Sequence, residues 1–155
     1  MDNPAEVGSG HLDNVRRRRA DLHDVLVSLE SAIAAPTGAG RVAWAERVAK
    51  ELGRVDDELD AHVAATEGAD GLYAEILVDA PRLAPSVRRL QDEHGELRAT
   101  LDDTNGRVEA LAAGGADDVA GAREAVLGLL GAFARHRQVG ADLVYEAYET
   151  DIGGG

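Results

Sequence analysis

The chain has 155 residues and a formal net charge of −13, from 29 acidic and 16 basic residues, and it contains no cysteine. The lack of cysteine excludes disulfides, thiolate metal sites and cysteine nucleophiles. The acidic balance argues against a nucleic-acid-binding surface, which needs a concentrated basic face. The length is typical of one domain with a substantial core.

Hydrophobic periodicity predicts helices over residues 11–35, 41–67, 72–78, 85–113 and 118–150. Proline and glycine end the first two of these segments, and short turns join the long ones. We therefore predict an all-α fold, an antiparallel up-down-up-down four-helix bundle, as a single domain over residues 11–150. The polar, glycine-rich ends, residues 1–10 and 151–155, are expected to be flexible.

Neither a targeting signal nor a membrane association is expected. The first 14 residues contain no apolar segment of the kind that a signal peptide needs. The longest mostly apolar run, from Val126 to Ala134, is far shorter than the ~20 residues of a membrane-spanning helix. We therefore expect a cytoplasmic protein.

A run of four arginines, Arg16–Arg19, is the one concentrated basic feature. On a helix these side chains spread around the cylinder, and Asp13, Asp21 and Asp24 lie near enough to pair with them. We interpret the run as a solvated helix start. The alternative is a docking site for an acidic partner.

Each long helical segment carries one histidine on or beside its apolar stripe: His23, His62, His94 and His136. The last three continue a 3-4 alternation of Leu, Val and Ala, so they occupy positions that a bundle buries. Burying an imidazole costs desolvation without the gain of an apolar side chain. Neutral imidazole is also a common ligand of transition metals. Four such histidines on four helices therefore favour a metal site over four structural histidines.

Helix lengths predict which histidines share a level in the bundle. His94 lies about 19 residues before one predicted turn and His136 about 19 residues after it, so their heights match. If heights are counted from one end of the bundle, His62 lies at the level of His94 and His136, and His23 lies roughly 15 Å from that level. If they are counted from the other end, His23 lies at that level and His62 does not. On the first count His11 competes with His23 for a place in the site.

The carboxylates of a dinuclear bundle site usually follow a histidine by four residues, so that both side chains face inward. Thr66 and Gly140 occupy those positions after His62 and His136. Two standard bridging carboxylates are therefore missing, and any dinuclear site would have to use other acids.

Two other acids are candidates for carboxylate ligands. Glu67 follows His62 by five residues, and it can turn inward only where the helix unwinds or bulges, which Gly68 permits. Its position alone favours an ordinary acid at a helix end. Glu146 lies near the seam of the last helix.

Four strings, one from each long helix, carry a family resemblance: LHDVLVSLE, LDAHVAATEG, VRRLQDEHGELRATL and LLGAFARHRQVGADLVYEAYETD. Together they resemble the hemerythrin-like HHE cation-binding family over residues 12–150. The resemblance implies a four-helix bundle that holds a non-haem di-iron site. Members of the family bind oxygen, sense oxygen or nitric oxide, or help to repair iron centres.

The resemblance implies that four histidines ligate iron, namely His23, His62, His94 and His136. The sequence departs from the family at Thr66 and Gly140, where members that help to repair iron centres have glutamate. The pair of histidines that oxygen carriers use on the third helix is also absent. Three outcomes remain open: a site rebuilt with Glu67 and Glu146, a site for a single ion, or a degenerate site.

Two functional hypotheses follow. The first is a hemerythrin-like non-haem iron protein, with one or two ions, that handles oxygen, nitric oxide or peroxide by binding or by catalysis. The second is a metal-free helical-bundle interaction module that has lost the site. They predict opposite effects of the substitution His94→Ala, which abolishes metal uptake under the first hypothesis and is neutral or stabilising under the second.

Overall fold

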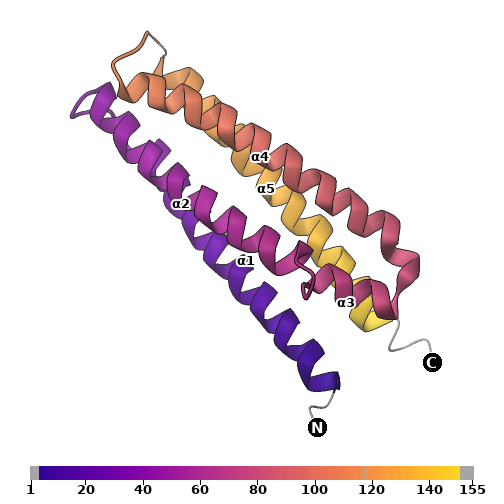
Figure 1. Ribbon diagram of the computed structural model, residues 1–155. Coiled ribbons are helices and arrows are strands. Elements are labelled where there is room, and N and C mark those ends of the chain that lie inside the picture. Colours follow the sequence, from indigo (N-terminus) through magenta and orange to yellow (C-terminus); the bar gives the residue numbers. More distant parts are fainter. Residues whose placement is uncertain (1–3, 117, 151–155) are drawn as a thin grey trace.

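The computed structural model describes residues 4–116 and 118–150. Its elements in chain order are α1 (Pro4–Ala34), α2 (Arg41–Glu67), α3 (Leu72–Asp79), the 3-10 helix η1 (Pro81–Leu83), α4 (Ala84–Ala112), α5 (Val119–Tyr145) and the π-helix η2 (Glu146–Thr150). The four long helices run alternately up and down, and α3 lies at the end of the bundle that also holds the two chain ends (Figure 1). The predicted all-α four-helix bundle is confirmed.

The helix boundaries differ from the predicted ones mainly at the two ends of the chain. α1 begins at Pro4, seven residues before the predicted start, and proline is tolerated in a first helical turn because its missing N–H has no helical partner there. The last helix changes from α to π geometry at Glu146. Of the ends predicted to be flexible, residues 1–10 and 151–155, the segments 1–3 and 151–155 lie outside the described residues, and residues 4–10 belong to α1.

Two apolar clusters fill the bundle, and a polar layer separates them. The larger cluster contains Leu59, Leu97 and Phe133, and the smaller one, at the α3 end, contains Leu90 and Leu143. On α4 and α5, a buried histidine lies between a residue of each cluster. The apolar stripes thus bring one histidine from each of three helices to a single level.

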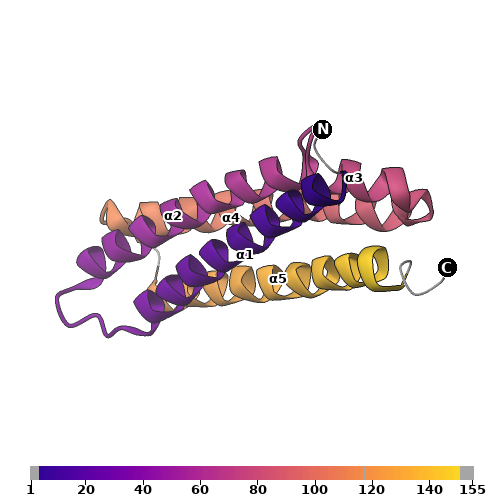
Figure 2. The ribbon, with the colours of Figure 1, turned by 90° about the horizontal axis from the view of Figure 1, so that it is seen from below.

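The seam between α1 and α5 is the loosest in the bundle. α1 packs mainly against α2, α2 against α4, and α4 against α5, whereas α1 and α5 share much less contact. The view from below shows α1 diverging from α5 toward its amino-terminal end (Figure 2). This divergence leaves room for a cleft between the two helices.

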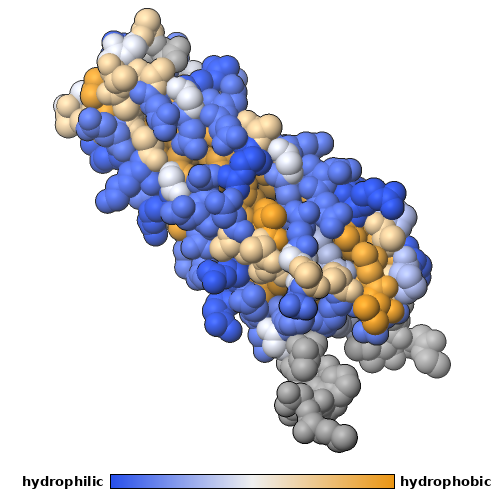
Figure 3. Space-filling model, in the orientation of Figure 1, coloured by the Kyte–Doolittle hydropathy of each residue, from blue (hydrophilic) through white to orange (hydrophobic). Residues whose placement is uncertain are grey.

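The face of the molecule seen in Figure 3 is mostly hydrophilic and is interrupted by apolar patches, one of them at the end where α3 joins α4. α3 also carries the most exposed large apolar side chain among the described residues, Val78, which is 80% exposed. Within residues 4–116 and 118–150, no helix is both long and apolar enough to cross a membrane.

Candidate metal centre

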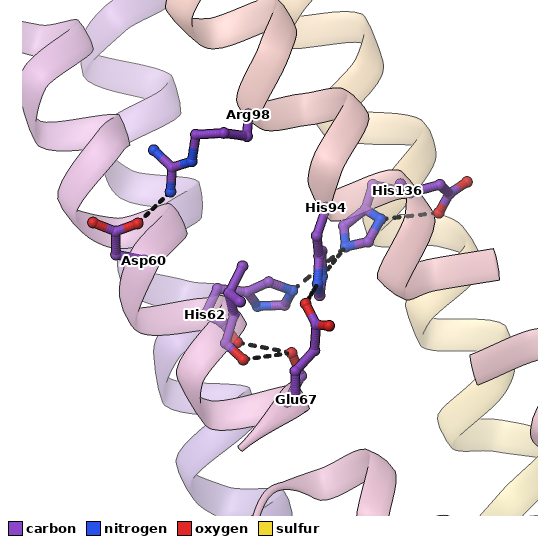
Figure 4. A network of polar contacts seen from close by, with 9 residues as sticks. Asp60, His62, Glu67, His94, Arg98 and His136 are labelled. Carbon is purple, nitrogen blue, oxygen red and sulfur yellow. Dashed lines mark hydrogen bonds and ion pairs between the residues drawn. The ribbon is translucent and has the colours of Figure 1, made fainter. Parts of the chain in front are cut away.

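Three histidines from three helices meet inside the bundle (Figure 4). His62 of α2 and His94 of α4 are 4% exposed, and His136 of α5 is 6% exposed. The distance from Nε2 of His136 to Nε2 of His94 is 3.0 Å, and that to Nε2 of His62 is 3.4 Å. Among the described residues this is the one group of three or more histidines and acids with its ligand atoms within 4.8 Å of one another.

In two of these rings, the nitrogen that points away from the other histidines, Nδ1, contacts a carboxylate. Nδ1 of His94 lies 2.6 Å from Oε2 of Glu67, and Nδ1 of His136 lies 3.0 Å from Oε2 of Glu93. Because a carboxylate only accepts hydrogen bonds, Nδ1 carries the proton when either ring is neutral, and Nε2 then keeps a lone pair. Two such lone pairs that face each other at 3.0 Å repel unless a proton or a metal ion lies between them. Metal-ligating histidines are oriented by outer carboxylates in the same way.

The spacing of the Nε2 atoms matches the edges of a coordination polyhedron. With metal–nitrogen bonds of about 2.0–2.1 Å, neighbouring nitrogens lie about 3.3 Å apart in a tetrahedral site and about 2.9 Å apart in an octahedral one. The observed separations are 3.0 and 3.4 Å. These two separations fit imidazoles that share a single ion.

The surroundings keep two of the imidazoles neutral. Burial, reinforced by His94, His136 and Arg19, lowers the pKa of His62 to about 3. Burial is also the main cause that lowers the pKa of His136, against the opposing effect of Glu93. Neutral imidazole is the form that ligates metal. Nδ1 of His62 is buried and has no hydrogen-bond partner among the described residues, so this ring is the one held least firmly.

Two polar side chains complete the wall around His94 and His62. The ring of Tyr73 stacks on that of His94, with centroids 6.1 Å apart and planes 15° apart. Burial raises the pKa of Tyr73 to about 12, so its phenol stays protonated at neutral pH. The Thr66 hydroxyl donates to the backbone carbonyl of His62 at 2.9 Å. Thr66 therefore bonds within its own helix, its hydroxyl also acts on the Tyr73 phenol, and it does not replace a bridging carboxylate.

Of the two predicted carboxylate ligands, Glu67 contacts a histidine of this centre and Glu146 does not. α2 ends after Glu67, because Gly68 leaves the helical conformation, and the free end lets the Glu67 carboxylate reach the outer nitrogen of His94. Glu67 is therefore a partner of a candidate ligand in this arrangement. Glu146 is exposed at the start of the π-helix and is not part of the histidine group.

The histidine of the first helix lies apart from the other three. His23 is exposed, and its Nδ1 accepts a hydrogen bond from Nη1 of Arg137 at 3.1 Å. His11 is also distant from the group, and its Nδ1 lies 2.8 Å from Oε2 of Glu75. Of the two level counts made on the sequence, the structure has the one that combines His62 with His94 and His136.

α1 contributes an arginine to this region instead of a histidine. A Cβ atom built at Gly140 would lie 2.8 Å from Nη2 of Arg19, so the glycine makes room for the guanidinium. A sequence signal for Arg19 exists, because it lies four residues after Val15 and three before Leu22 on the buried stripe. Sequence reasoning assigned Arg19 to a solvated run and did not pair Glu93 with His136.

A cleft of about 580 Å³ connects the surface to the histidines between α1 and α5. His62, His136 and Tyr73 line the cleft, and so does Arg19, whose guanidinium lies against Gly140. The remaining lining is largely apolar and comes from both helices: Leu22, Leu26, Val27, Leu130, Phe133 and Ala134. A small molecule in the cleft would therefore reach two of the three imidazoles directly.

Comparison of the chain with protein-family models, with curated proteins and with solved structures found no match. The bundle and the histidine centre are therefore the features that indicate the class of protein. Any relation to hemerythrin-like proteins rests on the four strings in the sequence.

Proposed function

We propose that this protein is a metal-binding four-helix bundle in which Nε2 of His62, His94 and His136 hold one divalent transition-metal ion. The observation that carries the proposal is the convergence of three buried Nε2 atoms, two of them on rings whose Nδ1 atoms contact carboxylates. Without a metal, Leu or Val at these positions would stabilise a bundle core more than imidazole does. A bound cation turns the repulsion between the lone pairs into attraction.

One ion is favoured over a di-iron pair by the groups that surround the histidines. The positions that would supply two bridging carboxylates hold Thr66 and Gly140, and the space above Gly140 is filled by the Arg19 guanidinium. A permanent positive charge beside His136 disfavours a second metal ion there. Glu67 and Glu93 are engaged by the outer nitrogens of the ligating rings.

We propose ferrous iron as the ion, since imidazole ligates iron well and the resemblance to hemerythrin-like proteins favours it. When bound, such an ion supplies open coordination positions for oxygen, nitric oxide or peroxide. The cleft between α1 and α5 gives these small ligands a path to the centre. Its apolar walls reduce the access of water, and the protonated Tyr73 phenol in its lining offers a hydrogen-bond donor.

The stoichiometry of metal binding tests this proposal. Titration of the chelator-treated protein with Zn²⁺, and with Fe²⁺ without oxygen, is expected to end at one ion per chain by calorimetry. Elemental analysis of the dialysed product gives an independent count. Two ions per chain would contradict the single-ion centre in favour of a di-iron site. Failure to retain any ion would contradict metal binding and favour the metal-free interaction module.

A further inference from the structure

The cleft between α1 and α5 has a cationic end, and no carboxylate of the described residues is paired with Arg19 there. Arg19 is half-buried there and makes no hydrogen bond or ion pair with any side chain that the structure describes. Burial lowers the pKa of Arg19, Tyr73 opposes this effect, and the nearby Arg137 and Arg16 lower the pKa further. Guanidinium groups remain charged in proteins, so three positive charges gather at this place in a chain of net charge −13.

An unpaired, half-buried cation is unfavourable unless a partner satisfies it. The neighbouring acid of the lining, Glu30, lies eleven residues from Arg19 along α1, about 16 Å away, and does not neutralise it. Arg137 is directed to His23, to which it donates a hydrogen bond. The guanidinium of Arg19 thus presents free donors to the cleft.

The shape and the lining of the cleft restrict what an anionic partner can be. A volume of about 580 Å³ is within the range typical of sites for small organic molecules. One planar guanidinium matches a carboxylate through two parallel hydrogen bonds. The apolar side chains beyond it, among them Leu26 and Phe133, fit a hydrocarbon body.

We infer that this cleft binds a small organic monocarboxylate with an apolar tail, its carboxylate on Arg19 and its tail between α1 and α5. The site goes beyond the proposed metal centre and does not depend on it, because the charge and the apolar walls belong to the metal-free chain. A ligand bound in this way places its carboxylate next to His136, on the side from which the histidines are reached.

Calorimetric titration of the chelator-treated protein with octanoate tests the inference. Octanoate is expected to bind at one molecule per chain, and octan-1-ol and acetate, which lack the charge or the tail, at least about tenfold more weakly. Arg19→Gln is expected to weaken octanoate binding at least about tenfold. Arg17→Gln is the matched control, because Arg17 is exposed in the same run, and it should leave the affinity unchanged.

A second variant moves the guanidinium without removing it. In Gly140→Ala the new methyl group takes the space of Arg19 Nη2, and the flexible arginine can swing away, so the fold should tolerate the change. The helix should melt at the same or a higher temperature, since alanine is the better helix former, while octanoate binding should weaken.

Three results would overturn the inference. They are the absence of octanoate binding in the metal-free protein, equal binding of octan-1-ol, and binding that needs Zn²⁺ and is unchanged in Arg19→Gln. The last result would assign the carboxylate to the metal, and it would leave the metal centre intact. Conversely, octanoate binding that depends on Arg19 in a chain that takes up no metal would support the cleft site and contradict the proposed function.

Discussion

Replacement of His94 or His136 by alanine is expected to lower the affinity for Zn²⁺ and Fe²⁺ by at least about 100-fold. Loss of an outer partner of a ligand already costs about 10- to 100-fold, and these substitutions remove a ligand itself. Both rings lie at the centre of the group, with their Nε2 atoms 3.0 Å apart. Metal titration by calorimetry measures the effect, and helical circular dichroism shows whether each variant folds. His94→Gln, which is closer in size, serves if the alanine variant does not fold.

His23→Ala is the matched control for these variants. It removes an imidazole from the same chain, but His23 is exposed and bonded to Arg137, outside the histidine group. Its metal affinity should equal that of the unaltered protein. A loss comparable to that of His94→Ala would mean that all four helices supply a histidine, as the family resemblance implies, and would contradict the three-histidine centre.

His62→Leu is expected to stabilise the metal-free protein while it abolishes metal binding. Nδ1 of His62 is buried without a partner, and such an unsatisfied group costs about 1–3 kcal/mol. Leucine replaces it with an apolar side chain between two apolar clusters. At pH 7 and in the presence of a chelator, the free energy of unfolding should rise by about 1–2 kcal/mol.

The same variant should change the pH dependence of stability. The pKa of His62 is lowered to about 3 in the folded chain, against about 6.5 when unfolded, so below pH 6.5 the unfolded state binds the extra proton. Stability is therefore full above pH 6.5 and is lost as the pH falls toward 3. Between pH 7 and 5 this histidine accounts for a loss of about 2 kcal/mol, which His62→Leu removes.

Denaturant unfolding at pH 7 and at pH 5, with chelator present, measures both effects. His23→Leu is the control, and as a surface substitution it should change stability by less than about 0.5 kcal/mol. A destabilisation by His62→Leu in the metal-free protein would mean that the imidazoles form a stabilising network of their own. The imidazoles would then stabilise the fold by themselves, which contradicts their retention for a metal.

The fold was predictable because the apolar periodicity of the chain is regular. The seam residues of α2 and α4, from Val48 to Thr66 and from Val87 to Leu111, recur at the spacing that a buried helix face requires. The extra turns at the amino terminus were missed because residues 4–10 carry no such pattern. Periodicity identifies which face of a helix is buried, and it says little about where a polar end begins.

The candidate site was predictable only in part. Periodicity placed His62, His94 and His136 in the core, and the counts of helix length left open whether His62 or His23 shares the level of the other two. Which of these two histidines joins the group depends on how far α1 is shifted along α2. No local pattern in a single sequence encodes that shift. The pairing of Glu93 with His136 likewise depends on how α4 and α5 face each other. Arg19 could have been predicted as part of the site, since the sequence places it on the apolar stripe of α1.

A long-range proton–nitrogen correlation spectrum of the histidine side chains tests the central claim most directly. In the metal-free protein, His94 and His136 should show a protonated Nδ1 and an unprotonated Nε2. One equivalent of Zn²⁺ should shift the Nε2 resonances of exactly three rings, those of His62, His94 and His136, and leave His11 and His23 unchanged. A spectrum in which no Nε2 resonance shifts, or in which His23 shifts with the others, would contradict the three-histidine centre.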